Sequence, residues 1–423
     1  MRGEGYPIVL PNVRDPRLHL AAVIVSLQIL GQVAFGFDLS IAQILISIGT
    51  CALLELSIVA RRHHVLAWPA SALLTGNGVA FVLRVPGTEH GDWWSTQGWW
   101  IFAGTAATAL LSKYVIRYRG SHVFNPSNFG LVLCFLLLGP GRVEPLDFWW
   151  GPVSPALVLA LVIIVVGGVA ILSRLALLGL AVSFWIVFVG VVAVVASTGH
   201  AITARWHYGP VEGLHLWTIL AFSPEILVFL FFMLTDPKTV PAGPRQRIRF
   251  GVTVALVAAL LVASSSTEFW AKVGVLGALT IVCAVRPLAA LASSRRPRRL
   301  VLAALLGVLG AAYMGALLTA GSATRAATSP AVPTTQSTKA PRVVIRPSKG
   351  VDSALDRPVA VKIAADLQRR RSGTTLRQVT VWLEARSGQF PAVVAVLDWP
   401  SSRQLVEVEP KLDGYRIARV LER

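Results

Sequence analysis

Charged residues are scarce in this sequence: they make up 14% of its 423 residues, whereas a soluble domain carries about 25%. Acidic residues are scarcer still, with 21 Asp and Glu against 39 Lys and Arg, so the formal net charge is +18. In a membrane protein such an excess collects in cytoplasmic loops, and no nucleic-acid partner is expected. The three cysteines, Cys51, Cys134 and Cys283, fall in apolar runs without a Cys-x-x-Cys spacing, which argues against disulfide, zinc and iron–sulfur sites. No Ser-His-Asp set, metal-ligand cluster or phosphate-binding loop stands out, so independent enzymatic turnover is not predicted.

In place of charged residues the sequence contains long apolar runs, and 54% of its residues are hydrophobic. The runs Pro155–Leu172 and Leu300–Ala320 contain no carboxylate and no interior basic residue. Since a helix needs about 20 such residues to cross a bilayer, the pattern predicts an all-α polytopic membrane protein with about ten or eleven spans. Glu55, inside the second span, is expected near the membrane interface beside Arg61. The expected spans are residues 18–36, 41–60, 65–84, 97–112, 122–139, 155–173, 175–197, 214–235, 249–266, 270–285 and 300–320.

Basic residues concentrate in every second connection between these spans. The intervening connections carry acidic residues and the tryptophan pairs Trp93–Trp94 and Trp149–Trp150. By the positive-inside rule the N-terminus is then cytoplasmic, and everything after Ala320 is extracytoplasmic. We therefore expect a multi-pass protein of a bacterial plasma membrane, in contact with membrane lipid. The basic connections hold Arg61 and Arg62; Lys113, Arg117 and Arg119; Arg174; Lys238, Arg245, Arg247 and Arg249; and Arg295, Arg296, Arg298 and Arg299.

The composition changes after the last expected span. Residues 321–341 are rich in Ser, Thr, Ala and Pro, which is typical of a disordered linker. The remainder is polar, with a helical pattern over 357–371 and alternating patterns over 379–383, 392–397, 405–408 and 415–420, which predict a small α+β domain. The chain therefore divides into a membrane domain (1–290), an additional transmembrane helix (291–320), the linker (321–341) and an extracytoplasmic domain (342–423).

Three interruptions occur within the apolar spans: Thr75-Gly-Asn-Gly78, Phe124-Asn-Pro126, and Ser223-Pro-Glu225 followed by Thr235-Asp-Pro237. A broken helix at membrane depth must be covered by protein or line a water-filled cavity, and its half-helix N-termini attract anions such as phosphate. The breaks recur in each half of the chain, which suggests an inverted repeat of about ten helices. The alternative is that Gly and Pro are simply frequent in membrane helices. The candidate cofactor-binding residues are Thr75, Asn77, Asn125, Asn128, Ser223, Glu225, Thr235, Asp236 and Lys238.

At these residues the sequence resembles the NqrB/RnfD family, the large membrane subunits of the sodium-pumping quinone reductase and of Rnf electron-transport complexes. The matching segments are Ser71-Ala-Leu-Leu-Thr-Gly76, Trp93-Trp94, Lys113, Phe124-Asn-Pro-Ser-Asn-Phe-Gly130 and Phe231-Phe-Met-Leu-Thr-Asp-Pro-Lys-Thr239. They follow the family's order over residues 15–290. Relatives associated with enediyne biosynthesis clusters look similar.

The resemblance implies an inverted-repeat fold and electron transfer through bound flavin, in a complex with redox partner subunits. In the family, FMN is joined through its phosphate to the last threonine of a Ser/Thr-Gly-Ala-Thr motif, about nine residues before Thr-Asp-Pro. Here the corresponding residues are Ser223-Pro-Glu-Ile226, and Ile226 has no hydroxyl to form the phosphoester. Covalent FMN is therefore not expected at Ile226, and a non-covalent FMN or riboflavin is the expected cofactor. Glu225 would repel a phosphate there unless it is protonated by burial.

Three functions are consistent with these observations. The leading one is a membrane subunit of a flavin-linked electron-transport system, acting as a component of an oxidoreductase complex. The second is a transporter or channel for a small solute or ion, because inverted repeats with broken helices suit that equally well. The third is a membrane scaffold whose external domain recruits a redox enzyme.

Overall fold

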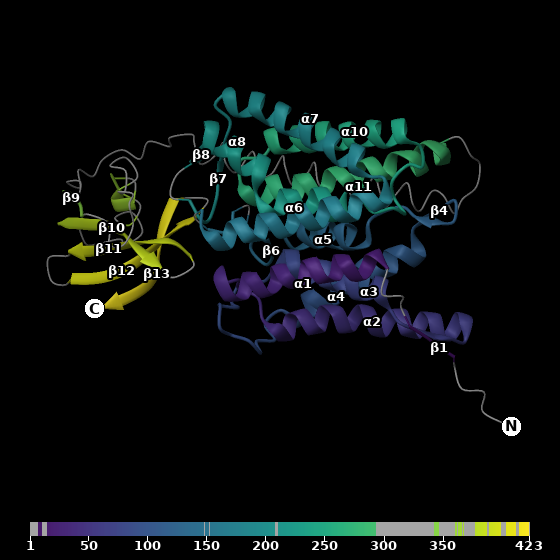
Figure 1. Cartoon of the computed structure of the whole chain (residues 1–423). Helices are drawn as coiled ribbons and strands as arrows, with labels where there is room; N and C mark the ends of the chain where they lie inside the picture. Colours follow the sequence, from purple (N-terminus) through teal and green to yellow (C-terminus); the bar gives the residue numbers. More distant parts are fainter. Residues whose placement is uncertain are drawn as a thin grey trace.

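The computed structural model consists of a helical part and a C-terminal sheet (Figure 1). It describes residues 7–10, 15–292 except 148, 152, 208 and 209, 342–346, 360, 361, 363–365, 367, 377–386, 389–398, 403–411 and 414–422. The eleventh span expected at 300–320 and the linker expected at 321–341 lie outside the described residues.

The helices of the first part coincide with the ten spans expected between residues 18 and 285. Seven segments among the described residues are long and apolar enough to cross a membrane, so the chain is a multi-pass membrane protein. Helices α3 and α5 are shorter, at 13 residues each, or roughly 20 Å at 1.5 Å per residue. The elements are α1 (Pro16–Ala34), α2 (Ile41–His63), α3 (Ala70–Val82), α4 (Trp99–Val115), α5 (Pro126–Leu138), α6 (Pro155–Leu175), α7 (Leu178–Ser197), α8 (Gly213–Phe222), α9 (Pro224–Val228), the π-helical turn η1 (Phe229–Met233), α10 (Pro244–Ala263) and α11 (Glu268–Ala292).

Local sequence signals place several helix starts. Asp15 caps α1, and the Ser40 hydroxyl accepts a hydrogen bond from the Gln43 N–H while the Gln43 side chain accepts one from the Ser40 N–H. This reciprocal arrangement satisfies two backbone donors that the first turn of a helix leaves unpaired. Proline occupies the first turn of α1, α5, α6 and α10, where its missing N–H costs nothing.

Contacts between connections define one end of the helical part, which we call the basic end. Strand β1 (Ile8–Val9), before α1, pairs with β2 (Leu66–Ala67), between α2 and α3. The Arg247 guanidinium, at the start of α10, donates to the Ala176 carbonyl, between α6 and α7, at 2.9 Å. The connection between α4 and α5 is the hairpin β4 (Arg117–Tyr118) and β5 (Ser121–His122). The basic clusters from Arg61 to Arg249 therefore share one end, as the alternation along the sequence predicts.

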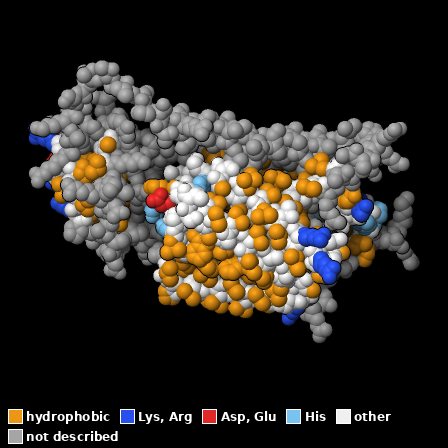
Figure 2. Space-filling view, turned by 90° about the horizontal axis from the view of Figure 1, so that it is seen from above, with side chains coloured by type: hydrophobic (Ala, Val, Ile, Leu, Met, Phe, Trp, Pro, Cys, Tyr) orange, Lys and Arg blue, Asp and Glu red, His pale blue; other side chains and the backbone are white. Residues whose placement is uncertain are grey.

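The remaining connections meet at the other end, which we call the opposite end. Strand β3 (Leu83–Arg84) pairs with β6 (Glu144–Pro145), and the Ile41 N–H donates to the Trp93 carbonyl at 2.9 Å. The hairpin β7 (Ala201–Thr203) and β8 (Pro210–Glu212) contacts the connection between α10 and α11. Figure 2 shows an apolar surface between an end where Lys and Arg side chains gather and an end with acidic and histidine side chains.

Helix α3 corrects one expectation, because it runs without a break through Thr75-Gly-Asn-Gly78. A Cβ on Gly76 would lie 2.6 Å from the Ser47 carbonyl oxygen of α2, and the Ser47 hydroxyl donates to the Gly76 carbonyl at 2.8 Å. The glycine therefore allows two helices to pack closely, as small residues do in membrane bundles. It does not interrupt the helix.

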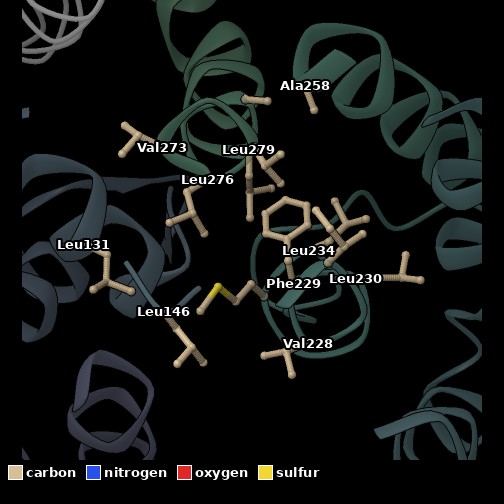
Figure 3. Packing of buried hydrophobic residues seen from close by; sticks show 14 of the residues in the cluster. Leu131, Leu146, Val228, Phe229, Leu230, Leu234, Ala258, Val273, Leu276 and Leu279 are labelled. Atoms are coloured by element: carbon tan, nitrogen blue, oxygen red, sulfur yellow. The ribbon is translucent and has the colours of Figure 1, made fainter. Parts of the chain in front are cut away.

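The other two interruptions coincide with ends of helices. Helix α5 begins at Pro126 with Asn125 as its N-cap. Helix α8 ends at Phe222, Ser223 is extended, and α9 begins at Pro224, so the span that runs to Met233 is broken near its middle. Where α9, η1 and α11 meet, the interior is packed with aliphatic and aromatic side chains that include Phe229, Leu276 and Leu279 (Figure 3).

The C-terminal part is a five-stranded sheet in the order β13-β12-β11-β10-β9. The expected helix over 357–371 corresponds to helical residues at 360, 361, 363–365 and 367. Ala360, Ile363 and Leu367 are buried against Val379 and Val381 of the sheet, which agrees with the expected α+β composition. Strand β9, parallel to β10, was not anticipated. The strands are β9 (Arg342–Ile345), β10 (Gln378–Arg386), β11 (Gln389–Asp398), β12 (Arg403–Lys411) and β13 (Gly414–Glu422).

Candidate functional site

A cavity of about 710 Å³ lies at the basic end, and we call it the vestibule. Its mouth includes the exposed residues Arg17, Arg117 and Lys238, and its lining reaches inward to the buried side chains of Phe81 and Met233. Segments that are far apart in the sequence meet around it: residues 15–24, 71–81, 113–127, 171–175 and 228–238.

One wall carries an ion pair between helices near the basic end. The Lys113 ammonium of α4 donates to both carboxylate oxygens of Glu55 in α2, at 2.9 and 3.1 Å, and to the Ser71 hydroxyl of α3 at 3.0 Å. The side chains of Lys113 and Glu55 are only 19% and 13% exposed. Glu55 therefore pairs with a lysine two helices away in the sequence, and Lys113 neutralises a carboxylate that would otherwise be costly in this position.

The facing wall is built by the two proline-containing segments. Asn125 caps α5 by accepting from the Asn128 N–H at 3.1 Å and from the Ser127 hydroxyl at 2.9 Å. Its amide nitrogen also donates to the Met233 carbonyl at 3.3 Å, so the start of α5 is tied to the end of η1. His122 Nε2 lies 3.2 Å from Asp236 Oδ2, which makes a second link between the same segments.

Five of the nine residues expected to bind a cofactor line the vestibule. The two threonines among them donate their hydroxyl hydrogens to the backbone carbonyl four residues earlier. Thr75 Oγ1 donates to the Ser71 carbonyl at 2.9 Å and Thr235 Oγ1 to the Phe231 carbonyl at 2.5 Å. Each hydroxyl keeps its acceptor lone pairs free for a ligand. The five residues are Thr75, Asn125, Thr235, Asp236 and Lys238.

The remaining four expected residues lie outside the vestibule lining. Asn77 is buried, and Asn128 donates to the Leu276 carbonyl and the Thr280 hydroxyl of α11, both at 3.0 Å. Asn128 is therefore a link between helices rather than a ligand donor. Ser223 is fully buried, and Glu225 lines a separate small cavity.

The electrostatic character of the mouth is basic. Arg17 is paired with Asp15, and this guanidinium holds the pKa of the Asp15 carboxyl below its ordinary value. Arg117 donates to the Gly120 carbonyl of the β4–β5 turn, and Lys238 is exposed. Around the interior, by contrast, the lining is largely apolar, with Leu20, Ile24, Phe81, Ile171, Leu172, Val228, Phe231 and Phe232.

A second cluster of charges, near the opposite end, was missed by the sequence reasoning. Lys272 of α11 is 2.5 Å from Glu268 and 3.4 Å from Asp147, and it also donates to the Pro145 carbonyl. Arg84 lies nearby and donates to the carbonyls that end α3. A single lysine inside the expected span 270–285 was the signal that could have found it, because ionisable residues in apolar spans are functional candidates.

No family model matches the chain, and no curated protein matches it. The features of the chain that point to a function are the vestibule and the charged residues within the spans.

Proposed function

We propose that the protein is a membrane subunit of a flavin-linked electron-transport system and that it binds flavin without a covalent bond in the vestibule. The observation that carries the proposal is the meeting of residues 71–78, 121–127 and 231–238 around one cavity at the basic end. These are the segments on which the sequence resembles flavin-carrying membrane subunits.

The vestibule suits a flavin in size and chemistry. Its volume of about 710 Å³ lies within the range of roughly 300–1,000 Å³ found for small-molecule and cofactor sites. The aromatic and aliphatic interior fits an isoalloxazine ring, and Thr75, Asn125 and Thr235 offer polar groups for its edge. Arg117 and Lys238 at the mouth would neutralise a phosphate, and the α5 N-terminus favours an anion as well.

Non-covalent binding follows from the residues near the broken span. Ile226 is buried, carries no hydroxyl and lies outside the vestibule lining. A bound flavin would supply one-electron and two-electron transfer. The chain's own residues would hold and orient it: the Lys113–Glu55 pair and the Asn125 and His122 links fix the walls, and the apolar interior keeps water away from the ring.

The proposal is tested by purifying the chain under gentle conditions with its natural partners. Flavin should be released on denaturation, and a denaturing gel should show no fluorescent band. Thr75→Val should weaken flavin binding about tenfold, since a lost hydrogen bond to a ligand is worth roughly 1 kcal/mol or somewhat more. Thr50→Val is the matched control, because Thr50 makes the same bond to the carbonyl four residues back but lies outside the vestibule.

Two results would contradict the proposal. Absence of flavin in the gently purified assembly would remove its main claim. A fluorescent band on the gel would mean that a hydroxyl elsewhere, such as that of Thr218 or Ser223, carries the cofactor.

We also propose that the helical part is an inverted repeat, with α1–α5 as one half and α6–α11 as the other. What supports this is the matched order of packing. Helix α2 packs on α3 and α4 and α4 on α5, while α7 packs on α8 and α10 and α10 on α11. An experimental structure should superpose residues 16–138 on residues 155–285 with the membrane direction reversed.

Transport of a small anionic solute is the second candidate, and one observation favours it. The vestibule and the small cavity beside Glu225 share Phe81, Val228 and Met233 in their linings. Only these apolar side chains therefore separate the vestibule, with its basic mouth, from the cavity beside Glu225. Solute flux in liposomes without any redox partner would favour this function over electron transport.

A further inference from the structure

Glu225 is a carboxylate placed near the middle of a candidate membrane span. It is the second residue of α9, directly after the break at Ser223, within the span Gly213–Met233. Both of its carboxylate oxygens are buried, and neither has a hydrogen-bond partner within the described part of the chain. Such a group needs an explanation, because buried polar atoms are nearly always paired.

The surroundings of Glu225 are apolar. It lines a cavity of about 40 Å³ together with Val82, Leu146, Phe229 and Leu276. Leu146, Val228, Phe229 and Leu276, four of the residues that line this cavity, are among the packed side chains in Figure 3. The cavity is large enough to admit water, which needs roughly 10–15 Å³.

The charges around Glu225 do not neutralise it. Lys272 lines the same cavity from α11, but it already faces Glu268 and Asp147. Arg84 is the other nearby cation, and Asp38 and Asp147 act on it as well, so both cations already face other carboxylates. The charged residue of α6, which packs on α9, is Arg174 in its last turn at the basic end, and α8 contributes His215 in its first turn.

An ionised carboxylate in such a place is strongly unfavourable, whereas a neutral carboxyl is tolerated. A proton on Glu225 removes its charge without further ligands. We propose that Glu225 is a proton-binding site at mid-membrane depth that exchanges its proton with the vestibule across the layer formed by Phe81, Val228 and Met233.

The exchange route follows from the shared lining. Phe81, Val228 and Met233 line both the vestibule and the Glu225 cavity. Rearrangement of their side chains would join the two cavities. The proton-binding site does not depend on flavin, so its test is independent of the test of the proposed electron-transport function.

Dicyclohexylcarbodiimide tests for the proton directly. The carboxyl oxygen bonds to the carbodiimide carbon while the acid proton moves to a carbodiimide nitrogen. The resulting O-acylisourea rearranges to a stable N-acylurea, and no atom is lost. Since the reagent needs a protonated carboxyl in an apolar place, the full chain in membranes should be labelled at Glu225 even at about pH 8, where ordinary carboxyls are ionised.

Peptide mass spectrometry locates the adduct. Glu225→Gln should abolish it, and Glu225→Asp should retain it. Glu212→Gln is the matched control and should leave the labelling unchanged, because Glu212 is exposed and lines neither the vestibule nor the Glu225 cavity. No adduct on Glu225 between about pH 6 and pH 8, in protein that remains folded by gel filtration, would overturn the proposal. Protection by Na⁺ at constant pH would overturn it in favour of a sodium site.

The exchange route has its own measurement. In sealed vesicles of known orientation, labelling of Glu225 should follow the pH on the side of the basic end and ignore the pH on the other side. Labelling that follows the pH of the opposite end would overturn the vestibule route and place the exchange along Lys272.

Discussion

The Lys113–Glu55 pair shows how a charged side chain between packed helices is stabilised by a partner on another helix. Removing either charge leaves the other one unpaired between helices α2, α3 and α4. Breaking a partly buried ion pair in this way lowers the free energy of unfolding by roughly 3 kcal/mol. We expect Lys113→Met and Glu55→Gln each to lower the melting temperature in detergent. The double variant should lose less than the sum of the two, and a double-mutant cycle measures the difference. Additive losses would show that the pair contributes nothing.

Gly76 offers a second residue-scale prediction. A Cβ at Gly76 would meet the Ser47 carbonyl at 2.6 Å, so Gly76→Ala must separate α2 from α3 and should destabilise the protein by about 1–3 kcal/mol. Gly49→Ala is the matched control on α2, because a Cβ at Gly49 meets nothing within 4 Å and alanine favours the helix. Thermal unfolding in detergent compares the two variants. Equal melting temperatures would contradict close packing at Gly76.

At the residue scale, the sequence predicted which residues lie at the cavity better than it predicted what those residues contact. Thr75, Asn125 and Thr235 were anticipated near a cavity, and they line the vestibule. The partner of Glu55 could not be foreseen, because residues 55 and 113 are brought together only by the packing of α2 against α4. Lys272 was overlooked since a single charge hardly changes the mean hydropathy of a long apolar run.

At the scale of elements, the start of α5 depends on Asn125. Asn125→Ala removes both the cap and the bond to the Met233 carbonyl, and loss of a cap alone costs about 1 kcal/mol. Asn125→Asp keeps the cap acceptor and removes the donor to Met233. We therefore expect stability in the order wild type, Asn125→Asp, Asn125→Ala, measured by thermal unfolding in detergent. An aspartate variant less stable than the alanine variant would show that a buried charge outweighs the cap.

The existence of the helices was predictable, because an apolar run of about 20 residues has few other structures in a membrane. The interruptions of the helices were harder to predict than the helices themselves. Proline correctly marked two of them, because α5 begins at Pro126 and α9 at Pro224, and proline lacks the N–H that would continue a preceding helix. Glycine at Gly76 and Gly78 was misleading, because glycine serves close packing as readily as it breaks a helix. The π-helical turn η1 left no signal in the apolar run Phe229–Met233.

For the whole molecule, the gathering of basic connections at one end predicts its orientation. Reporter fusions at Gly120 and Gly243, both at the basic end, should report a cytoplasmic location, because basic loops stay on that side. A fusion at Gly350 should report the other side, as the expected eleventh span requires. A cytoplasmic Gly350 fusion would mean that the chain after α11 does not cross the membrane again.

The C-terminal part should fold without the membrane part. Its sheet and the helical residues 360, 361, 363–365 and 367 enclose a hydrophobic core of their own, which is the property of an independent domain. A fragment of residues 342–423 should show a cooperative thermal transition by circular dichroism. A random-coil spectrum would contradict this prediction.

The position of the vestibule mouth has a consequence for the life of the protein in the cell. All of its exposed lining belongs to the basic end, so an occupant can arrive only from the compartment that this end faces. With the cytoplasmic orientation predicted above, the proposed flavin would not have to be exported, and newly inserted chains would be filled from the cytosolic pool after folding.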